Sequence, residues 1–248
     1  MSAARIATKS KSQEEFIKIF SGICKTESPW QAWSDFVECS AIAISQKADR
    51  RTEREERYLS IAKKYGAGMN KFPELFACMV ESMDENQEQD FLGDTFMRLE
   101  LGSHFHGQFF TPYDVSRMMG EMMAEECVNQ IQENGWCKIN DPACGAGAML
   151  VAARNALKNM GVDWPEKALF VGQDISKEAA MMCYIQSSLM GCAGYVIVGN
   201  TLTSRVGTSD GVFPVANGDT EIWLTPALMV NPAWKVREII GRAQNETH

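Results

Sequence analysis

The sequence predicts an α/β fold, in which a parallel sheet with right-handed crossovers follows an all-helical N-terminal domain. Residues 13 to about 100 repeat apolar residues at helical spacing. Beyond Gly135, apolar runs alternate with helical patterns in the order strand–helix–strand–helix–strand. A glycine loop, NDPACGAGAML (140–150), joins the first of these strands to a helix. We therefore expect a helical domain over residues 1–100 and an α/β domain over residues 101–248.

Each stretch of the N-terminal part has an apolar face of its own. EEFIKIF (14–20) has helical spacing, and Pro29 opens a second run that places Trp33 and Phe36 on one face. Further helical patterns follow in RTEREERYLSIAKKY (51–65), KFPELFACMVESM (71–83) and QDFLGDTFMRLEL (89–101). The charges at 49–57 indicate a solvated helix face.

A helix start follows the loop LGSHFHGQFF (101–110). Thr111 is expected at the cap and Pro112 at the first helical position, with an acid at 114. Val115 and the methionines of 118–123 then share one helix face. We expect these methionines, and those of 181–190, to lie in the core.

The α/β part is expected to alternate as follows. Strands are predicted in WCKIN (136–140), ALFVGQD (168–174) and GYVIVGN (194–200), and helices over 148–160 and 176–190. The segment 204–220 is rich in Gly, Ser, Asp and Asn and reads as a flexible loop. PALMV (226–230) is predicted to be a short fourth strand.

Composition limits the classes of protein. The 248 residues are 45% hydrophobic and 23% charged, which is typical of a soluble globular protein, and no apolar run approaches a membrane span. Eight cysteines without CxxC pairs, and no secretory signal, indicate reduced thiols in a cytoplasmic protein. None of the three histidines stands at ligand spacing from a pair of cysteines, so no metal is expected. A net charge of −8 opposes unaided binding to a phosphate backbone.

The glycine loop carries the strongest functional signal. It follows the carboxyl end of a predicted strand, where ligands bind in open α/β sheets. Gly145 and Gly147 allow the backbone to approach a ligand, Asp141 precedes them, and Asp174 ends the next strand. Asp174 suits the hydroxyls of a ribose, whereas Asp141 would repel a pyrophosphate but can hold a cationic amino-acid group. The pair favours S-adenosylmethionine over a nicotinamide dinucleotide; a plain tight turn and a nicotinamide-dependent oxidoreductase stay as alternatives.

Four motifs resemble one family in order and spacing: GQFFTPYDVSRMM (107–119), INDPACGAGAML (139–150), FVGQDIS (170–176) and VGNTL (198–202). They are similar to the methylation subunit of type I restriction–modification systems, a family of adenine-specific DNA methyltransferases. The resemblance covers about residues 90–203 and implies a Rossmann-like S-adenosylmethionine-dependent methyltransferase fold. The cofactor-binding residues that it implies are Phe110, Thr111, Pro112, Asp141, Ala143, Gly145, Gly147, Asp174, Ile175 and Asn200.

These implied residues divide by the part of the cofactor that each would contact. Residues 107–112 would close over the methionine end, and 141–147 would hold the amino-acid portion. Asp174 would bind the ribose, with Ile175 packed on the adenine ring. At Asn200 the family usually has Asp; the Asn amide oxygen can still accept a hydrogen bond from the adenine amine.

The catalytic motif departs further from the family pattern. Adenine-amine methylases carry Asn or Asp, two prolines and an aromatic residue, which accept hydrogen bonds from the target amine and stack on the flipped base. The candidate here is Asn231-Pro232-Ala233-Trp234, in which Ala233 replaces the second proline. Asn231, the Pro232 carbonyl and Trp234 are therefore the expected catalytic groups, with a coincidental turn as the alternative.

Two functions follow from the resemblance. The first is an enzyme that transfers a methyl group from S-adenosylmethionine to the exocyclic amine of adenine in DNA. The second is a catalytically deficient relative that binds the cofactor and acts through a restriction–modification partner. Because the chain ends soon after Trp234, we expect a shortened sheet whose open edge is covered by the N-terminal helices, a second copy or a partner subunit. DNA would be contacted through a specificity or second subunit, in a homo- or hetero-oligomer.

Overall fold

The computed structural model describes residues 10–101, 109–204, 206–208, 210–215 and 220–245. The helices are α1 (Lys11–Ile23), α2 (Pro29–Ser45), α3 (Thr52–Tyr65), the 3₁₀ helix η1 (Gly66–Asn70), α4 (Lys71–Glu85), α5 (Phe91–Arg98), α6 (Tyr113–Asn134), α7 (Ala148–Asn159), α8 (Trp164–Lys167), α9 (Lys177–Leu189), α10 (Pro226–Val230) and α11 (Pro232–Asn245). The strands are β1 (Cys137–Asp141), β2 (Ala168–Asp174), β3 (Ala193–Val198), β4 (Gly207–Thr208), β5 (Pro214–Val215) and β6 (Glu221–Leu224). Within these ranges, no helix is both long and apolar enough to cross a bilayer.

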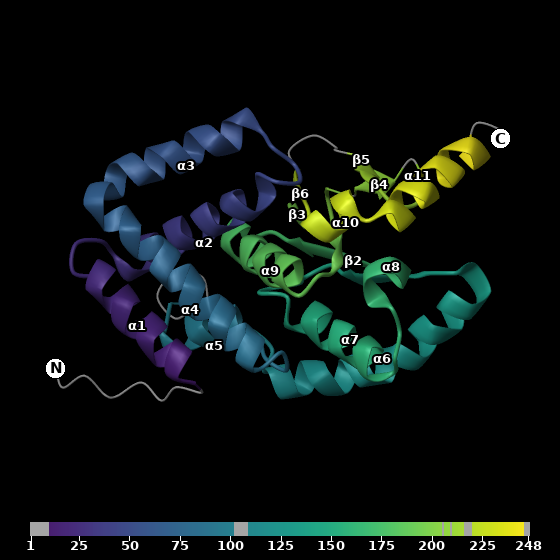
Figure 1. The fold of residues 1–248 in the computed structure, drawn as a ribbon, viewed down its shortest axis with the longest axis horizontal. Helices are drawn as coiled ribbons and strands as arrows, with labels where there is room; N and C mark the ends of the chain where they lie inside the picture. The colour runs from purple at the N-terminus through teal and green to yellow at the C-terminus, as the bar shows by residue number, and fades with distance from the viewer. Residues whose placement is uncertain (1–9, 102–108, 205, 209, 216–219, 246–248) are drawn as a thin grey trace.

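A four-stranded sheet in the order β1-β2-β3-β6 forms the centre of the molecule (Figure 1). β1, β2 and β3 are parallel, and their register places Asp141 opposite Gly172. The predicted strand–helix–strand–helix–strand order is confirmed: α7 and α9 are the crossovers between the parallel strands. β1 pairs with β2 alone, so among the described residues its other edge has no neighbouring strand.

The predicted fourth strand is wrong in position. Residues 226–230 form helix α10, because Thr225 caps it by accepting a hydrogen bond from Leu228 N at 3.4 Å and Pro226 occupies the first turn. The fourth strand is instead β6, which lies just before this helix and runs antiparallel to β3. The segment expected to be a flexible loop contains the β4–β5 hairpin, and the Val212 side chain between the two strands is buried.

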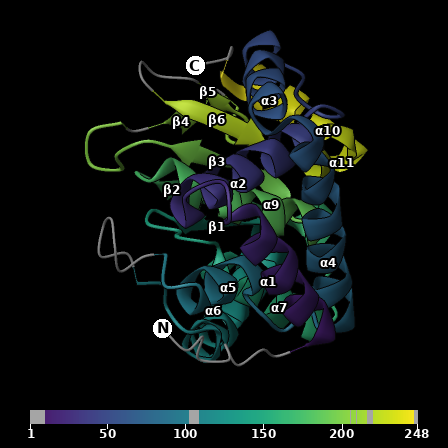
Figure 2. The ribbon, with the colours of Figure 1, turned by 90° about the vertical axis from the view of Figure 1, so that its left-hand side faces the viewer.

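The two faces of the sheet are covered differently. Phe170 and Val196 lie on the face that packs against α7, α9 and the N-terminal helices. Leu169 and Tyr195 lie on the opposite face, where Trp234 contributes to a smaller apolar cluster. Figure 2 shows helices α1, α2, α4 and α5 gathered on one side of the sheet. One buried cluster therefore runs from the N-terminal helices into the sheet, and the division into two domains stays a prediction.

Helix α6 differs from the prediction in its start and its orientation. It begins at Tyr113 with Pro112 as its N-cap residue, so Thr111 stands outside the helix. Its buried face consists of the small residues Ser116, Gly120, Ala124 and Cys127. A Cβ on Gly120 would lie 2.9 Å from the Ala152 carbonyl carbon, so α6 approaches the α7 backbone closely.

The methionines of α6 face outward as a result. The expectation that residues 118–123 lie in the core is wrong: Met118 is 58% exposed and Met122 is 74% exposed. The small-residue face is the one that can pack tightly on α7, and a helix cannot bury both faces against one neighbour. The methionines of the second stretch are buried as predicted, for example Met181 and Met182.

Candidate cofactor site

The glycine loop connects β1 to α7 and is fixed by backbone hydrogen bonds. Cys144 N donates to Gln173 O at 3.0 Å, and Gly147 N donates to Cys144 O at 2.8 Å. Gly145 and Gly147 have φ of 52° and 96°, values that L-residues with side chains rarely adopt. Gly147 then leads directly into α7, whose first N–H groups are available at this end of the helix.

Close packing also explains these two glycines. A Cβ on Gly145 would lie 2.9 Å from the Phe110 ring, and a Cβ on Gly147 would lie 3.0 Å from Cys183 Cα. Phe110 precedes α6 and Cys183 belongs to α9, so the loop is held between two distant parts of the chain. The conformation of this turn is therefore fixed by its packing against Phe110 and Cys183.

Asp141 and Asp174 end the neighbouring parallel strands β1 and β2, and both line the same cavity. Asp141 Oδ1 accepts a hydrogen bond from Ala143 N at 3.1 Å. Asp174 accepts two, from Gly145 N at 2.9 Å and from Ser176 N at 2.9 Å. Burial raises the pKa of Asp141, and the nearby Asp174 carboxylate adds to the rise, although the Ala143 N–H opposes it. A cationic group placed between the two carboxylates would relieve this repulsion.

The cavity has a volume of about 250 Å³ and lies where the parallel strands end. It is lined by Asp90, Phe109, Phe110, Thr111, Ser116, Asp141, Ala143, Cys144, Gly145, Ala146, Ala148, Met149, Asp174 and Ala179. Six of the ten predicted cofactor-binding residues are in this list: Phe110, Thr111, Asp141, Ala143, Gly145 and Asp174. The structure thus brings together segments on either side of α6 and from two strands.

The other four predicted residues lie at the margins. Pro112 lines an adjoining small cavity, which it shares with Phe110 and Thr111. Gly147 does not line the cavity but closes the turn through the hydrogen bond from its N–H to Cys144 O. Ile175, next to Asp174, is 71% exposed. Asn200 is half-buried after β3, and its Oδ1 accepts a hydrogen bond from Leu202 N at 2.9 Å. The predicted lid at 107–108 lies outside the described residues.

Sequence reasoning missed the contribution of α5 to this cavity. Asp90 caps α5 by accepting a hydrogen bond from Gly93 N at 2.8 Å, and its carboxylate also borders the cavity. Buried Gln186 of α9 donates to Asp90 Oδ1 at 2.8 Å and to Ala146 O at 2.7 Å. It therefore links α5 to the glycine loop. The cap position of Asp90 could have been found in the sequence, but the link through Gln186 depends on tertiary packing.

The predicted catalytic motif lies at the opposite end of the sheet. Asn231 Nδ2 and Trp234 Nε1 both donate to Pro165 O, at 3.2 and 2.8 Å. The Trp234 ring packs edge-on against Trp136, which immediately precedes β1, with centroids 5.8 Å apart. Pro232, the third predicted catalytic residue, begins α11.

The direction of β6 explains this placement. Because β6 is antiparallel to β3, the chain that follows it emerges at the amino ends of the parallel strands, whereas the glycine loop follows their carboxyl ends. Trp234 is 0% exposed, so its ring has no free face on which a flipped base could stack. The structure does not bring Asn231, Pro232 and Trp234 to the cavity, and their predicted catalytic role finds no support in this arrangement.

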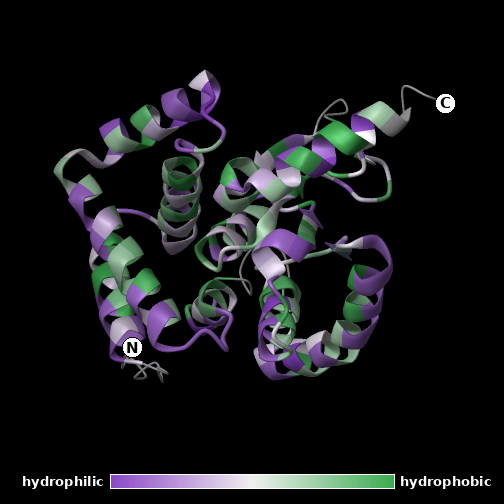
Figure 3. Ribbon diagram, turned by 45° about the vertical axis from the view of Figure 1, so that its right-hand side comes forward, coloured by the Kyte–Doolittle hydropathy of each residue, from purple (hydrophilic) through white to green (hydrophobic). Residues whose placement is uncertain are grey.

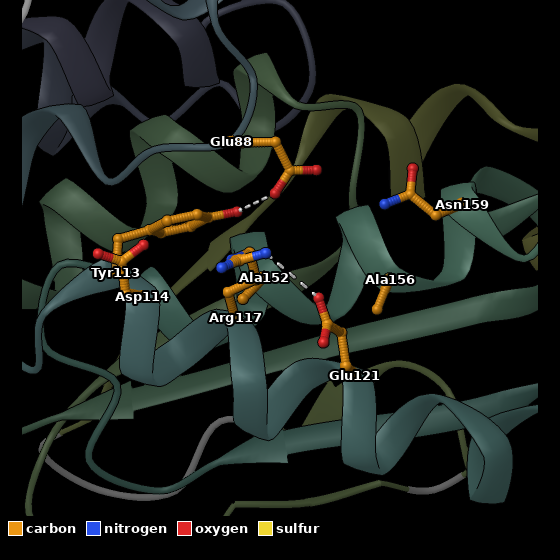
Figure 4. A pocket seen from close by; sticks show the side chains of 8 residues that line it. All are labelled: Glu88, Tyr113, Asp114, Arg117, Glu121, Ala152, Ala156 and Asn159. Atoms are coloured by element: carbon orange, nitrogen blue, oxygen red, sulfur yellow. Dashed lines mark hydrogen bonds and ion pairs between the residues drawn. The ribbon is translucent and has the colours of Figure 1, made fainter.

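A second cavity, of about 300 Å³, lies between α6 and α7 (Figure 4). Its polar lining includes Asp114, Arg117 and Glu121 of α6, together with Glu88, which accepts a hydrogen bond from the Tyr113 hydroxyl at 3.0 Å. No glycine loop borders it. The arrangement is a polar flank of α6 rather than a second nucleotide-type site.

The fold and the first cavity define a Rossmann-like α/β domain with a ligand-sized cavity at the carboxyl ends of its parallel strands. The sequence model of the N-6 DNA methylase family matches residues 88–240. Because this match covers more than half of the chain, the protein belongs to the N-6 DNA methylase family.

The chain is similar to a Listeria monocytogenes protein assigned as a class I S-adenosylmethionine-dependent methyltransferase, with 17% identity and a TM-score of 0.46. The similarity covers 79% of this chain and 56% of that one, so the chain spans little more than half of its length. No curated protein sequence gave a significant match.

Proposed function

We propose that this protein binds S-adenosylmethionine in the cavity at the glycine loop and transfers its methyl group to the exocyclic amine of adenine in DNA. In this proposal it acts as a methylation subunit similar to those of type I restriction–modification systems. One observation carries the proposal: Asp141, residues 143–146 of the glycine loop and Asp174 line a single cavity in a chain of the N-6 DNA methylase family.

The chemistry of the cavity suits this cofactor. Its described lining residues include three carboxylates and no Lys or Arg, which suits a cationic ligand with hydroxyl groups better than a pyrophosphate, because the carboxylates would repel phosphates. The Ser116 hydroxyl is buried and has no hydrogen-bond partner among the described residues, although it borders the cavity. A buried hydroxyl without a partner is costly, and a polar ligand would satisfy it.

Each residue then has a specific task in binding. The Asp174 carboxylate accepts hydrogen bonds from the ribose hydroxyls, while Asp141 and the loop hold the ammonium group of the amino-acid portion. The bound cofactor supplies a methyl group activated by its sulfonium, so the protein contributes mainly orientation and exclusion of water. The acceptor amine is oriented by groups other than Asn231 and Trp234, because these lie at the far end of the sheet. With a net charge of −8, DNA is contacted through a second subunit.

Calorimetric titration with S-adenosylmethionine tests the binding part of the proposal. Asp174→Asn loses the charge and keeps an oxygen acceptor for only one of the two backbone N–H groups, Gly145 N or Ser176 N, and should weaken binding about tenfold or more. Asp84→Asn is the matched control, because Asp84 is exposed on α4 and does not line the cavity. Equal affinity in wild type and Asp174→Asn would contradict the site, and so would binding of NAD in preference to S-adenosylmethionine.

The position of the predicted catalytic motif favours a second function. Trp234 is buried, and the Asn231 amide donates its hydrogen bond to Pro165 O. In this alternative the chain binds the cofactor without transferring the methyl group and acts by binding a restriction–modification partner. Transfer of radiolabelled methyl groups to unmethylated DNA, alone and with a candidate partner, separates the two functions. Label in adenine supports the enzyme, whereas cofactor binding without label under either condition supports the alternative.

A further inference from the structure

Helix α6 exposes an apolar stripe that nothing in the described chain covers. Its members follow the spacing i, i+3, i+4, i+7 and i+8 and are Val115 (42% exposed), Met118 (58%), Met119 (43%), Met122 (74%) and Met123 (36%). This stripe lies opposite the small-residue face that packs on α7. A contiguous apolar face of this kind on a surface helix is typical of a protein–protein contact, and methionine side chains adapt well to a partner surface.

The borders of the α6 stripe are acidic. Asp114 and Glu121 lie on one flank, where Figure 4 shows them beside the polar cavity, and Glu125 and Glu126 follow the last methionine. Arg117 is the one basic side chain of α6, and it is 3.7 Å from Glu121 in an ion pair. The surface around the stripe is therefore negative.

Helix α11 carries a second exposed apolar stripe. Val236, Ile239 and Ile240 are 54%, 67% and 51% exposed and share one face of the helix. Lys235 is exposed beside this face, whereas the exposed Arg242 is already paired with Asp210 and Glu238 of the same copy. Figure 3 shows hydrophobic residues in green along α11, which projects away from the body of the molecule. The two stripes are each exposed, so they do not cover one another within one copy (Figure 1).

We propose that the α6 stripe of one copy packs against the α11 stripe of a second copy. The apolar side chains would leave water together, and Lys235 beside the α11 stripe would face the acidic residues around the α6 stripe. Charge also decides against a contact between two α6 stripes, because that would place acidic flanks next to each other without compensation. The contact is heterologous, since two different surfaces of the same chain meet.

This contact would lie close to the cofactor cavity. Ser116 lines the cavity from α6, one residue after Val115 of the stripe. The second copy would therefore sit near Phe109, which lines the cavity and is 75% exposed. Self-association is independent of the proposed methyl transfer, because it depends on neither cofactor nor DNA.

Sedimentation velocity on the full-length chain tests the contact through complementary variants. Wild type should form dimers or larger species, and Met122→Glu and Ile239→Glu should each be monomeric. An equimolar mixture of these two variants should recover dimers, because the intact α11 of one can bind the intact α6 of the other. Leu59→Glu is the matched control: Leu59 is 57% exposed on α3, far from both stripes in the sequence, and its variant should sediment as wild type.

Charge reversal provides an independent readout. Glu125 and Lys235 are exposed and have no ion-pair partner among the described residues, so their substitution leaves the fold of one copy intact. Glu125→Lys and Lys235→Glu should each weaken association, the double variant should regain it, and higher salt should weaken the wild-type contact. Any of three results would overturn the proposal. The wild type could be monomeric, the Ile239→Glu variant could associate as strongly as the wild type, or the equimolar mixture of Met122→Glu and Ile239→Glu could fail to form dimers.

Discussion

Replacement of Trp234 by alanine separates a packing role from a catalytic one. The indole is fully buried among apolar side chains of the sheet face opposite α7, and its Nε1 donates to Pro165 O at 2.8 Å. Loss of a buried tryptophan costs about 3–5 kcal/mol. The stacked Arg237, whose guanidinium carbon is 4.5 Å from the ring centroid, adds about 0.5–1 kcal/mol. Pro165 O keeps Asn231 as a donor, so no further cost arises from an unpaired carbonyl.

Urea unfolding measures this effect directly. Trp234→Ala should lower the free energy of unfolding by about 3.5–6 kcal/mol, which is a large fraction of the stability of a typical domain. Leu202→Ala is the control: the side chain is 85% exposed, so its loss should change stability by no more than about 0.5 kcal/mol. If Trp234→Ala leaves the midpoint of urea unfolding unchanged but abolishes methyl transfer, the packing role is refuted and the indole instead contacts the substrate.

Three further predictions concern the helix contact, the cavity and the loop. Gly120→Ala should destabilise the protein by about 1–3 kcal/mol because its Cβ would meet the α7 backbone, whereas Gly22→Ala, in open space on α1, should stabilise it by about 0.5–1 kcal/mol; thermal melts compare the two. The pKa of Asp141 is raised above its ordinary 3.8, so its contribution favours the folded state at low pH and is lost as the pH rises through the raised value. A cationic ligand needs the ionised carboxylate, so affinity for S-adenosylmethionine should increase as the pH rises through the raised pKa of Asp141. Calorimetry should find no such increase in Asp141→Asn. Gln186→Leu should cost at least about 2 kcal/mol in urea unfolding, because its buried partners lose their hydrogen bonds.

The elements around the glycine loop could be predicted because their signals are local. Apolar runs of strand length alternate with helical patterns, and Gly145 and Gly147 mark the turn between them. Parallel pairing of β1 and β2 then places Asp141 and Asp174 at one edge of the sheet, because carboxyl ends of parallel strands coincide. The position of these two carboxylates in one cavity followed from topology alone.

Other features depended on competition between faces or segments. The α6 pattern has both an apolar stripe and a small-residue stripe, and hydrophobicity alone selected the wrong one for the core. Close approach to the α7 backbone decided the orientation, and such an approach is not visible in residue order. Likewise, the direction of β6 determines on which side of the sheet Asn231 and Trp234 emerge, and a short strand has no local signal for its direction.

The sequence by itself therefore determined the order of helices and strands, the ligand-type loop and the two acids beside it, since these rest on spacing and on the backbone freedom of glycine. Only the tertiary structure decided that α6 presents its methionines to solvent, that Gln186 connects α5 to the loop, and that Trp234 lies in a core instead of a catalytic pocket. The physical reason is that burial of a side chain depends on how well it fits, and hydrogen-bonds with, segments that are distant in the chain. A local sequence pattern does not contain this information.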